Sequence, residues 1–196
     1  DDTVTLLSSS KIQTVTFSAN VTDNVGVSSL SLSGGVTASD TSGPDYTWTK
    51  TFNYDDYSYG TVNNGFTLTA TDAAGNSSSS YISIKITKTD DADPSITSIG
   101  RKNGSTANVT SVNLRSSTEN TETITFTVNV SDNVGVTGVT LTGATAVSNT
   151  SNQYIFSKSY AFADYSFGST TDSLTATATD SAGNTSTLGT SITIHK

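Results

Sequence analysis

Apolar and polar residues alternate over short stretches along most of the chain. In residues 15–21, VTFSANV, the apolar residues are Val15, Phe17, Ala19 and Val21. Successive side chains of a β-strand point to opposite faces, so these four side chains share one face. No stretch of helical length carries an apolar repeat of 3.6 residues. The pattern predicts an all-β protein of short strands.

The same pattern occurs twice, with an offset of 109 positions early in the repeat and 108 positions later. Such self-similarity indicates two homologous domains, which we expect at 1–89 and 90–196. Between them lies the charged linker KTDDADP, residues 88–94. The aligned segments are 15–35 with 124–144, 46–60 with 154–168, 68–78 with 176–186, and 82–88 with 190–196.

Strands of this number and spacing, separated by turn residues, predict two tandem immunoglobulin-like β-sandwich domains. In the order of that fold, residues 15–23 form strand B and residues 66–72 form strand F. These two strands belong to opposite sheets, and the loops that follow them lie at the same end of the sandwich. The second repeat is expected to place residues 124–132 and 174–180 in the same way.

Four aspartates continue the inward phase of these strands and end them: Asp23, Asp72, Asp132 and Asp180. We expect Asp23 to face Asp72, and Asp132 to face Asp180, across the end of each core. Two carboxylates in such a place repel each other and lose solvation.

Two explanations account for the paired carboxylates, and the loops alone leave both open. Each aspartate can accept backbone N–H bonds from its own turn. Alternatively, each pair can bind calcium, which takes six to eight oxygen ligands in proteins. The same loops carry four asparagines that could add ligands: Asn24, Asn76, Asn133 and Asn184.

The linker favours calcium in the second domain. Strand order brings the linker past Asp132 and Asp180, and this linker carries Asp90, Asp91 and Asp93. Five aspartates at one hinge call for a counter-ion, with Asp91 or Asp93 as the preferred linker ligand. The first domain has no such linker in this sequence, so its site is expected to be incomplete.

Composition excludes several other functions. The chain has no cysteine and a single histidine, His195, so thiol catalysis, zinc–thiolate sites and two-histidine metal sites are excluded. The formal net charge is −8, which disfavours nucleic acid as a partner. No apolar run has membrane-spanning length. Methionine is also absent, which indicates a processed or excised piece of a longer protein. We therefore expect a protein that is not an enzyme.

The repeats differ at their beginnings. The second opens with residues 94–114, and the first opens with residues 1–7, which match only the tail of that segment. The first domain is thus expected to lack the strand that SITSI, residues 95–99, forms in the second. Either the fragment was cut there, or a neighbouring chain donates the strand.

An aromatic-rich segment, residues 46–60, offers a possible sugar-binding surface. Its residues Tyr46, Trp48, Phe52 and Tyr54 share a strand face, however, and we expect them in the core. Lys50 and Lys158 fall in the same phase, which the sequence does not explain. Asp56 and Asp164 precede a tyrosine in each repeat and are expected to cap turns; neither is interpreted as catalytic.

The segments VSDNVGVTGVTLTG, TATATDSAGNTS and DPSITSI resemble the bacterial immunoglobulin-like repeats of large secreted adhesins and surface proteins. The resemblance implies an extracellular rod of stacked sandwiches, in some members stiffened by calcium, whose partners are the neighbouring repeats of the same chain. The expected function is a secreted or cell-surface stalk or spacer. Alternatives are a carbohydrate-binding accessory module that contacts surface glycans, or a filament subunit that self-associates by strand donation.

Overall fold

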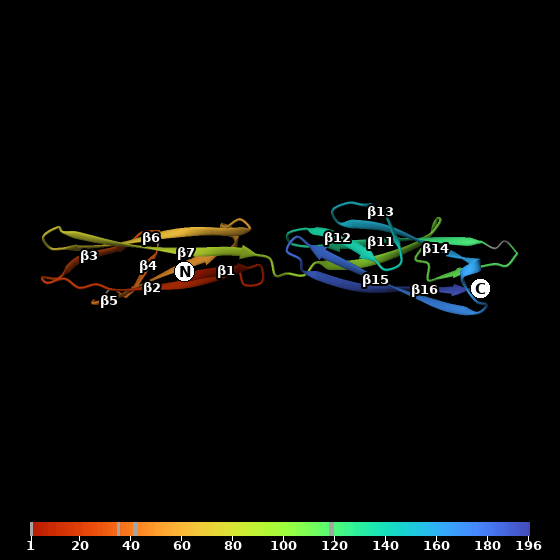
Figure 1. Cartoon of the computed structure of the whole chain (residues 1–196), viewed down its shortest axis with the longest axis horizontal. Helices are drawn as coiled ribbons and strands as arrows, with labels where there is room; N and C mark the ends of the chain where they lie inside the picture. The colour runs from red at the N-terminus through yellow and green to blue at the C-terminus, as the bar shows by residue number, and fades with distance from the viewer. Residues whose placement is uncertain (1, 35, 41–42, 118–119) are drawn as a thin grey trace. The chain divides into compact units, whose positions relative to one another are not determined.

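The computed structural model describes residues 2–34, 36–40, 43–117 and 120–196, and these residues form strands, turns and two short 3-10 helices (Figure 1). By its internal contacts the chain divides into two compact units, Asp1–Asp91 and Ala92–Lys196. No helix in the described ranges is long and apolar enough to cross a membrane. The prediction of an all-β, sandwich-type protein is confirmed.

The first unit is built from two sheets and one 3-10 turn. One sheet has the order β1-β7-β6-β3, and the other has the order β2-β5-β4. In Figure 1, β6 and β7 run side by side as a long antiparallel hairpin. The elements are β1 (Asp2–Leu7), β2 (Ile12–Asn20), β3 (Val27–Leu32), β4 (Thr37–Asp40), β5 (Asp45–Asn53), η1 (Tyr54–Asp56), β6 (Gly60–Asp72) and β7 (Ser77–Thr89).

The second unit repeats this plan with a larger second sheet. Its sheets have the orders β10-β16-β15-β12 and β13-β14-β11-β8-β9. The elements are β8 (Ser95–Asn103), β9 (Thr106–Ala107), β10 (Ser111–Asn113), β11 (Thr121–Ser131), β12 (Val136–Leu141), β13 (Thr145–Asn149), β14 (Gln153–Ala161), η2 (Phe162–Asp164), β15 (Ser169–Asp180) and β16 (Thr185–His195).

The strand phase read from the sequence is borne out in the core. In β11, Ile124, Phe126 and Val128 have no exposed surface, and Val130 is 3% exposed. Their partners come from β15 of the opposite sheet, where Leu174 is also buried. Strands β11 and β15, like β2 and β6, therefore lie in opposite sheets, as the immunoglobulin-like order predicts.

The aromatic segment of the first unit fills its core. Trp48, Phe52 and Tyr54 are 5%, 1% and 6% exposed, and Tyr46 packs against the same cluster. Sugar stacking needs an exposed ring face, so these buried rings do not provide one. The core role expected for them is confirmed.

The lysine that the sequence did not explain in the second unit has a carboxylate partner. The Lys158 ammonium lies 2.7 Å from Oδ2 of Asp172, and both side chains are about one-fifth exposed. Tyr160, two residues further along β14, donates its hydroxyl to the same oxygen. An ion pair with this partner satisfies a charge that lies in the inward phase of its strand.

Strand β8 is the main difference between the units. It pairs antiparallel with β11, from Ser95 opposite Ser131 to Asn103 opposite Ile124. Among the described residues of the first unit, the equivalent edge of β2 has no paired strand. In the second unit, β8 covers this edge of the sheet.

Candidate functional site

The candidate site is the pair of aspartates at the ends of strands in each unit. Asp72 and Asp180 are the last residues of β6 and β15. Asp132 directly follows β11, and Asp23 occupies the aligned position after β2. The loops after these strands place one aspartate from each sheet at the same end of its own unit.

The loops after β2 and β11 use their aspartates in the same way. Oδ1 of Asp23 accepts the backbone N–H groups of Val25 and Gly26, both at 2.8 Å. Oδ1 of Asp132 accepts those of Val134 and Gly135, again at 2.8 Å. Both glycines have φ of +132°, a backbone conformation that a side chain disfavours. The Asp-Asn-Val-Gly sequence therefore forms this turn in both units.

The loops after β6 and β15 form a second shared turn. Oδ1 of Asp72 accepts the N–H groups of Ala74 and Asn76, and its Oδ2 accepts the Asn76 side-chain amide at 2.7 Å. The Asn76 side-chain amide is the main cause that lowers the pKa of Asp72. Asp180 makes the same three bonds, with Ala182 and Asn184, each at 2.8 Å. All four aspartates thus hold their own loops, as the turn explanation predicts.

In the second unit, the turn hydrogen bonds do not use every oxygen of the two aspartates. Asp180 is 2% exposed, and Oδ2 of Asp132 is buried. Within the described part of the chain, this Asp132 oxygen has no hydrogen-bond partner. A buried polar atom without a partner is uncommon and destabilising in a folded protein. The turn explanation accounts for Oδ1 of Asp132 and leaves Oδ2 unexplained.

The two carboxylates of the second unit also lie close to each other. An oxygen of Asp132 lies within 4.8 Å of an oxygen of Asp180. Two unit charges at this distance repel each other by roughly 3.5 kcal/mol at an effective dielectric constant of about 20. Calcium binds oxygen at about 2.3–2.6 Å, so two oxygens on one ion lie at most about 5 Å apart. This acidic cluster therefore has a spacing that one cation can bridge.

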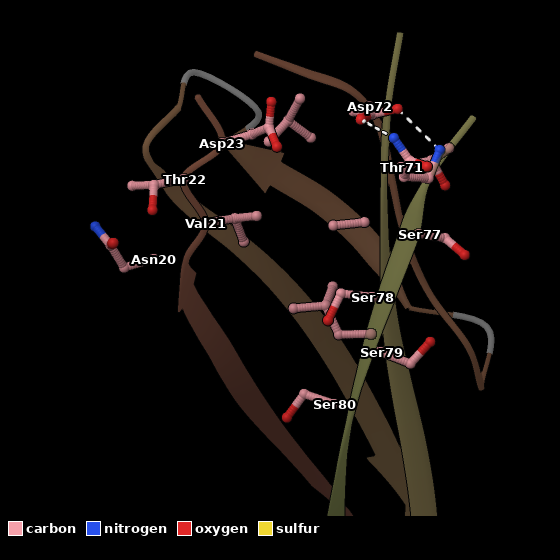
Figure 2. A pocket seen from close by; sticks show the side chains of 14 residues that line it. Asn20, Val21, Thr22, Asp23, Thr71, Asp72, Ser77, Ser78, Ser79 and Ser80 are labelled. Atoms are coloured by element: carbon pink, nitrogen blue, oxygen red, sulfur yellow. Dashed lines mark hydrogen bonds between the residues drawn. The ribbon is translucent and has the colours of Figure 1, made fainter. Parts of the chain in front are cut away.

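The first unit presents its pair in a more open setting. Asp23 is exposed, and Asp72 is half-buried. They border a hollow of about 460 Å³ that also includes residues 77–80 of β7. Figure 2 shows Asp23 and Asp72 at the same end of this hollow, with the serines of β7 along its side. Water has access to these carboxylates, so they carry less of the desolvation cost that Asp132 and Asp180 carry.

The predicted asparagine ligands are placed differently in the two kinds of loop. Asn24 and Asn133, which follow Asp23 and Asp132, are exposed. Asn184 is half-buried and donates to Asp180, and its amide also donates to the Ala92 carbonyl at 3.2 Å. This last bond holds the first residue of the second unit beside the turn after β15.

The linker aspartates have separate surroundings. Oδ1 of Asp91 accepts the Ser8 hydroxyl at 2.6 Å and the Ser9 N–H at 2.9 Å, and its Oδ2 accepts the Ser9 hydroxyl. These bonds, the Ser8 hydroxyl foremost, lower the pKa of Asp91 to about 2. Asp93 is exposed, whereas Asp90 is 5% exposed. The role of Ser8 and Ser9 was missed from the sequence, where the only signal was the polar run SSS after the first strand.

No protein-family model and no curated protein matches the sequence. Solved structures with a similar arrangement include the sialic-acid-binding region of a Streptococcus sanguinis SK1 adhesin bound to 3'sLn. Its sequence is 10% identical to this one. The match covers 100% of this chain and 76% of the adhesin chain, with a TM-score of 0.33. Domains EC3–6 of protocadherin gammaB7, seen as a cis-dimer, are 16% identical, with 98% and 45% coverage and a TM-score of 0.39.

Mouse clustered PcdhgC3 EC1–3 is also similar, at 11% identity, 100% and 65% coverage and a TM-score of 0.36. This chain therefore spans about three-quarters of the adhesin structure and less than half of the protocadherin gammaB7 structure. By their descriptions, the first of these structures is part of an adhesin and the other two are domains of protocadherins.

Proposed function

We propose that the chain is a non-enzymatic structural segment of an extracellular protein, in which tandem sandwich units act as a stalk or spacer of a bacterial adhesin or surface protein. We further propose that the second unit binds one calcium ion through Asp132 and Asp180. The observation that carries the calcium proposal is the buried Oδ2 of Asp132, which has no hydrogen-bond partner among the described residues, in a carboxylate that lies within 4.8 Å of an oxygen of Asp180.

The spacer role is supported by what the repeat preserves. Both units keep the same sandwich plan, the same two aspartate turns and an apolar core. Their surfaces are rich in serine and threonine, with only 13% charged residues in the chain. The repeat thus preserves the features that maintain the fold, which supports a structural role.

The proposed ion relieves the two unfavourable features of the pair. Its charge offsets the repulsion between Asp132 and Asp180, and Oδ2 of Asp132 gains a ligand bond. Oδ1 of each aspartate remains with its turn, so the loops do not rearrange on binding. This preformed geometry is the reason that we assign the second unit, and not the first, as the binding unit.

A carboxylate from the linker is proposed to complete the ligand set. Among Asp90, Asp91 and Asp93, Asp91 is held by Ser8 and Ser9, and Asp93 is exposed. Asp90 is buried, which makes it the preferred ligand.

Thermal unfolding with calcium and with excess chelator tests the proposal. A ligand at one hundred times its dissociation constant adds about 2.7 kcal/mol to the free energy of unfolding. At about 4–8 °C per kcal/mol for a domain of this size, the Tm of the second unit should rise by roughly 10 °C or more. Asp132→Asn should abolish the rise, and Asp164→Ala, in the exposed turn η2, should keep it. Equal Tm values with calcium and chelator would contradict the proposal.

A further inference from the structure

A serine occupies an inward-facing position beside the aspartate pair of the second unit. In the antiparallel pair of β15 and β16, Ser186 lies directly opposite Ala178, and Ala178 has no exposed surface. Directly opposite residues of such a pair place their side chains on the same face of the sheet. Asp180 lies two residues beyond Ala178 and therefore shares this face. The Ser186 side chain thus lies on the core side of β16, at the end of the sandwich that carries Asp180.

The hydroxyl of Ser186 is buried, and within the described residues it has no hydrogen-bond partner. Oδ2 of Asp132 shares both properties in the same unit. The hydroxyl of Thr137 on β12, by contrast, donates to the carbonyls of Asp180 at 2.7 Å and Thr179 at 3.1 Å. Buried polar atoms in folded proteins are almost always hydrogen-bonded, to protein or to ordered water. The two atoms without a protein partner therefore point to a polar group that both contact.

The two aspartates cannot complete the shell of a calcium ion. Oδ1 of Asp132 and Oδ1 of Asp180 each accept two backbone N–H groups, so the turns leave Oδ2 of each aspartate for an ion. Calcium takes about six to eight oxygen ligands, and water is common among them. Even with a linker carboxylate, an ion at this pair carries bound water. A buried water makes about three hydrogen bonds, so it needs polar partners beyond the ion.

The spacing across the sheet fits a water between Ser186 and the ion. Asp180 and Ser186 are diagonal neighbours of an antiparallel pair, which lie about 7–8 Å apart. A calcium–oxygen bond is about 2.4 Å long, and a hydrogen bond to water is about 2.8 Å long. A carboxylate, an ion and one ion-bound water can span such a separation. Ser186 makes no direct hydrogen bond to the carboxylate, which agrees with this separation.

The first unit carries a serine at the aligned position, in a different setting. Ser78 of β7 lies opposite Ala70 of β6, as Ser186 lies opposite Ala178. Ser78 is exposed, and it borders the hollow of Figure 2 with Asp23 and Asp72. Solvent reaches this hydroxyl, so it needs no bound group. Ser78 is therefore a matched control for Ser186.

We propose that Ser186 is a positioning residue of the calcium site, an inference that rests on the calcium site proposed above. Its hydroxyl accepts a hydrogen bond from a water that is itself a ligand of the ion held by Asp132 and Asp180. The ion polarises this water and makes it a stronger donor, and Ser186 fixes its orientation. Partners of this kind, which contact a ligand and not the metal, strengthen metal binding in proteins.

Calorimetric titration of the full chain with calcium chloride tests this role. Ser186→Ala should weaken calcium binding by roughly tenfold or more, because removal of an outer partner typically costs about 10–100-fold in metal affinity. The stoichiometry should remain one ion per chain, since both aspartates are retained. Ser78→Ala, the matched control in the first unit, should leave the affinity unchanged.

Thermal unfolding in excess chelator separates this role from a purely structural one. A buried hydroxyl without a partner destabilises the fold, and alanine fills nearly the same volume without the polar atom. The Tm of the second unit in chelator should therefore stay the same or rise in Ser186→Ala. The increase in Tm on calcium addition should become smaller at a calcium concentration near the wild-type dissociation constant. Calcium affinity and metal-free stability thus change in opposite directions, which loss of a structural hydrogen bond would not produce.

Three results would overturn the inference. If the wild-type chain binds calcium and Ser186→Ala binds it equally well, Ser186 has no part in a site that itself exists. If Ser186→Ala lowers the Tm in chelator, the hydroxyl serves the fold and not the ion. If Ser78→Ala weakens binding as much as Ser186→Ala, the assignment to the second unit is wrong. A wild-type chain that binds no calcium would instead contradict the proposed function, and this inference with it.

Discussion

Replacing Asp172 with asparagine should destabilise the second unit, because this carboxylate is the acceptor for a fully buried hydroxyl. The Tyr160 hydroxyl donates to Oδ2 of Asp172 at 2.8 Å, and Lys158 lies 2.7 Å from the same oxygen. Tyr160 has no exposed surface, and burial, together with the Asp172 charge, raises the pKa of its phenol well above the usual value. The phenol therefore stays protonated and donates throughout the accessible pH range.

The expected magnitude follows from the kind of each contact. A hydrogen bond to a charged group contributes about 1.5–3 kcal/mol, and a partly exposed ion pair contributes about 0–1 kcal/mol. Asparagine retains a weaker acceptor for Tyr160, so Asp172→Asn should lower the free energy of unfolding by about 2 kcal/mol. At about 4–8 °C per kcal/mol, the Tm of the second unit should fall by roughly 8–16 °C.

The first unit suggests Tyr160→Phe as the second substitution for a double-mutant cycle. At the positions aligned with Tyr160 and Asp172 it carries Phe52 and Asn64, which lack the hydroxyl and the charge. In a Tyr160→Phe background, Asp172→Asn should cost less by about 1 kcal/mol or more, because the hydrogen bond is already gone. Calorimetry resolves the transition of the second unit. Additivity of the two changes within about 0.5 kcal/mol would refute the reasoning.

Two further predictions concern the turn residues and the linker. Gly135→Ala should lower the free energy of unfolding of the second unit by about 1 kcal/mol or more in urea, because φ is +132° at this residue. Gly138→Ala in β12 is the control and should be nearly neutral. Equal effects of the two changes would contradict the strain argument. Ser8 and Ser9 hold the pKa of Asp91 at about 2, below its ordinary value of 3.8. The ionised carboxylate therefore stabilises the first unit above about pH 4, and this stabilisation is lost as the pH falls towards 2. Asp91→Asn should therefore reduce the fall in Tm between pH 5 and pH 2, and an unchanged fall would show that Asp91 does not cause it.

The strands and the position of the aspartate turns could be predicted because they depend on local order in the sequence. Alternation in residues 124–130 fixes which side chains of β11 face the core, and Asp132 follows in the same phase. The aligned repeat made this inference stronger, because a chance pattern would not recur at the same spacing. Turn formation by Asp132 and Asp180 also follows from their own short loops.

The remaining features depend on contacts between residues far apart in sequence. Asp91 bonds to Ser8 and Ser9, more than 80 positions earlier, and nothing in the linker itself indicates this. The buried Oδ2 of Asp132 depends on how the loops pack, which alternation does not determine. The partner of Lys158 was missed for the same reason, since Asp172 lies in a strand of the opposite sheet.

Calcium titration by isothermal calorimetry tests the central claim most directly, because the two units provide a matched control. Asp132→Asn and Asp23→Asn change the same turn in the two units, and asparagine can still accept the backbone N–H groups that each turn needs. The proposed site predicts one calcium ion per chain, lost in Asp132→Asn and retained in Asp23→Asn. No calcium binding at millimolar concentration, or equal loss in both variants, would contradict it.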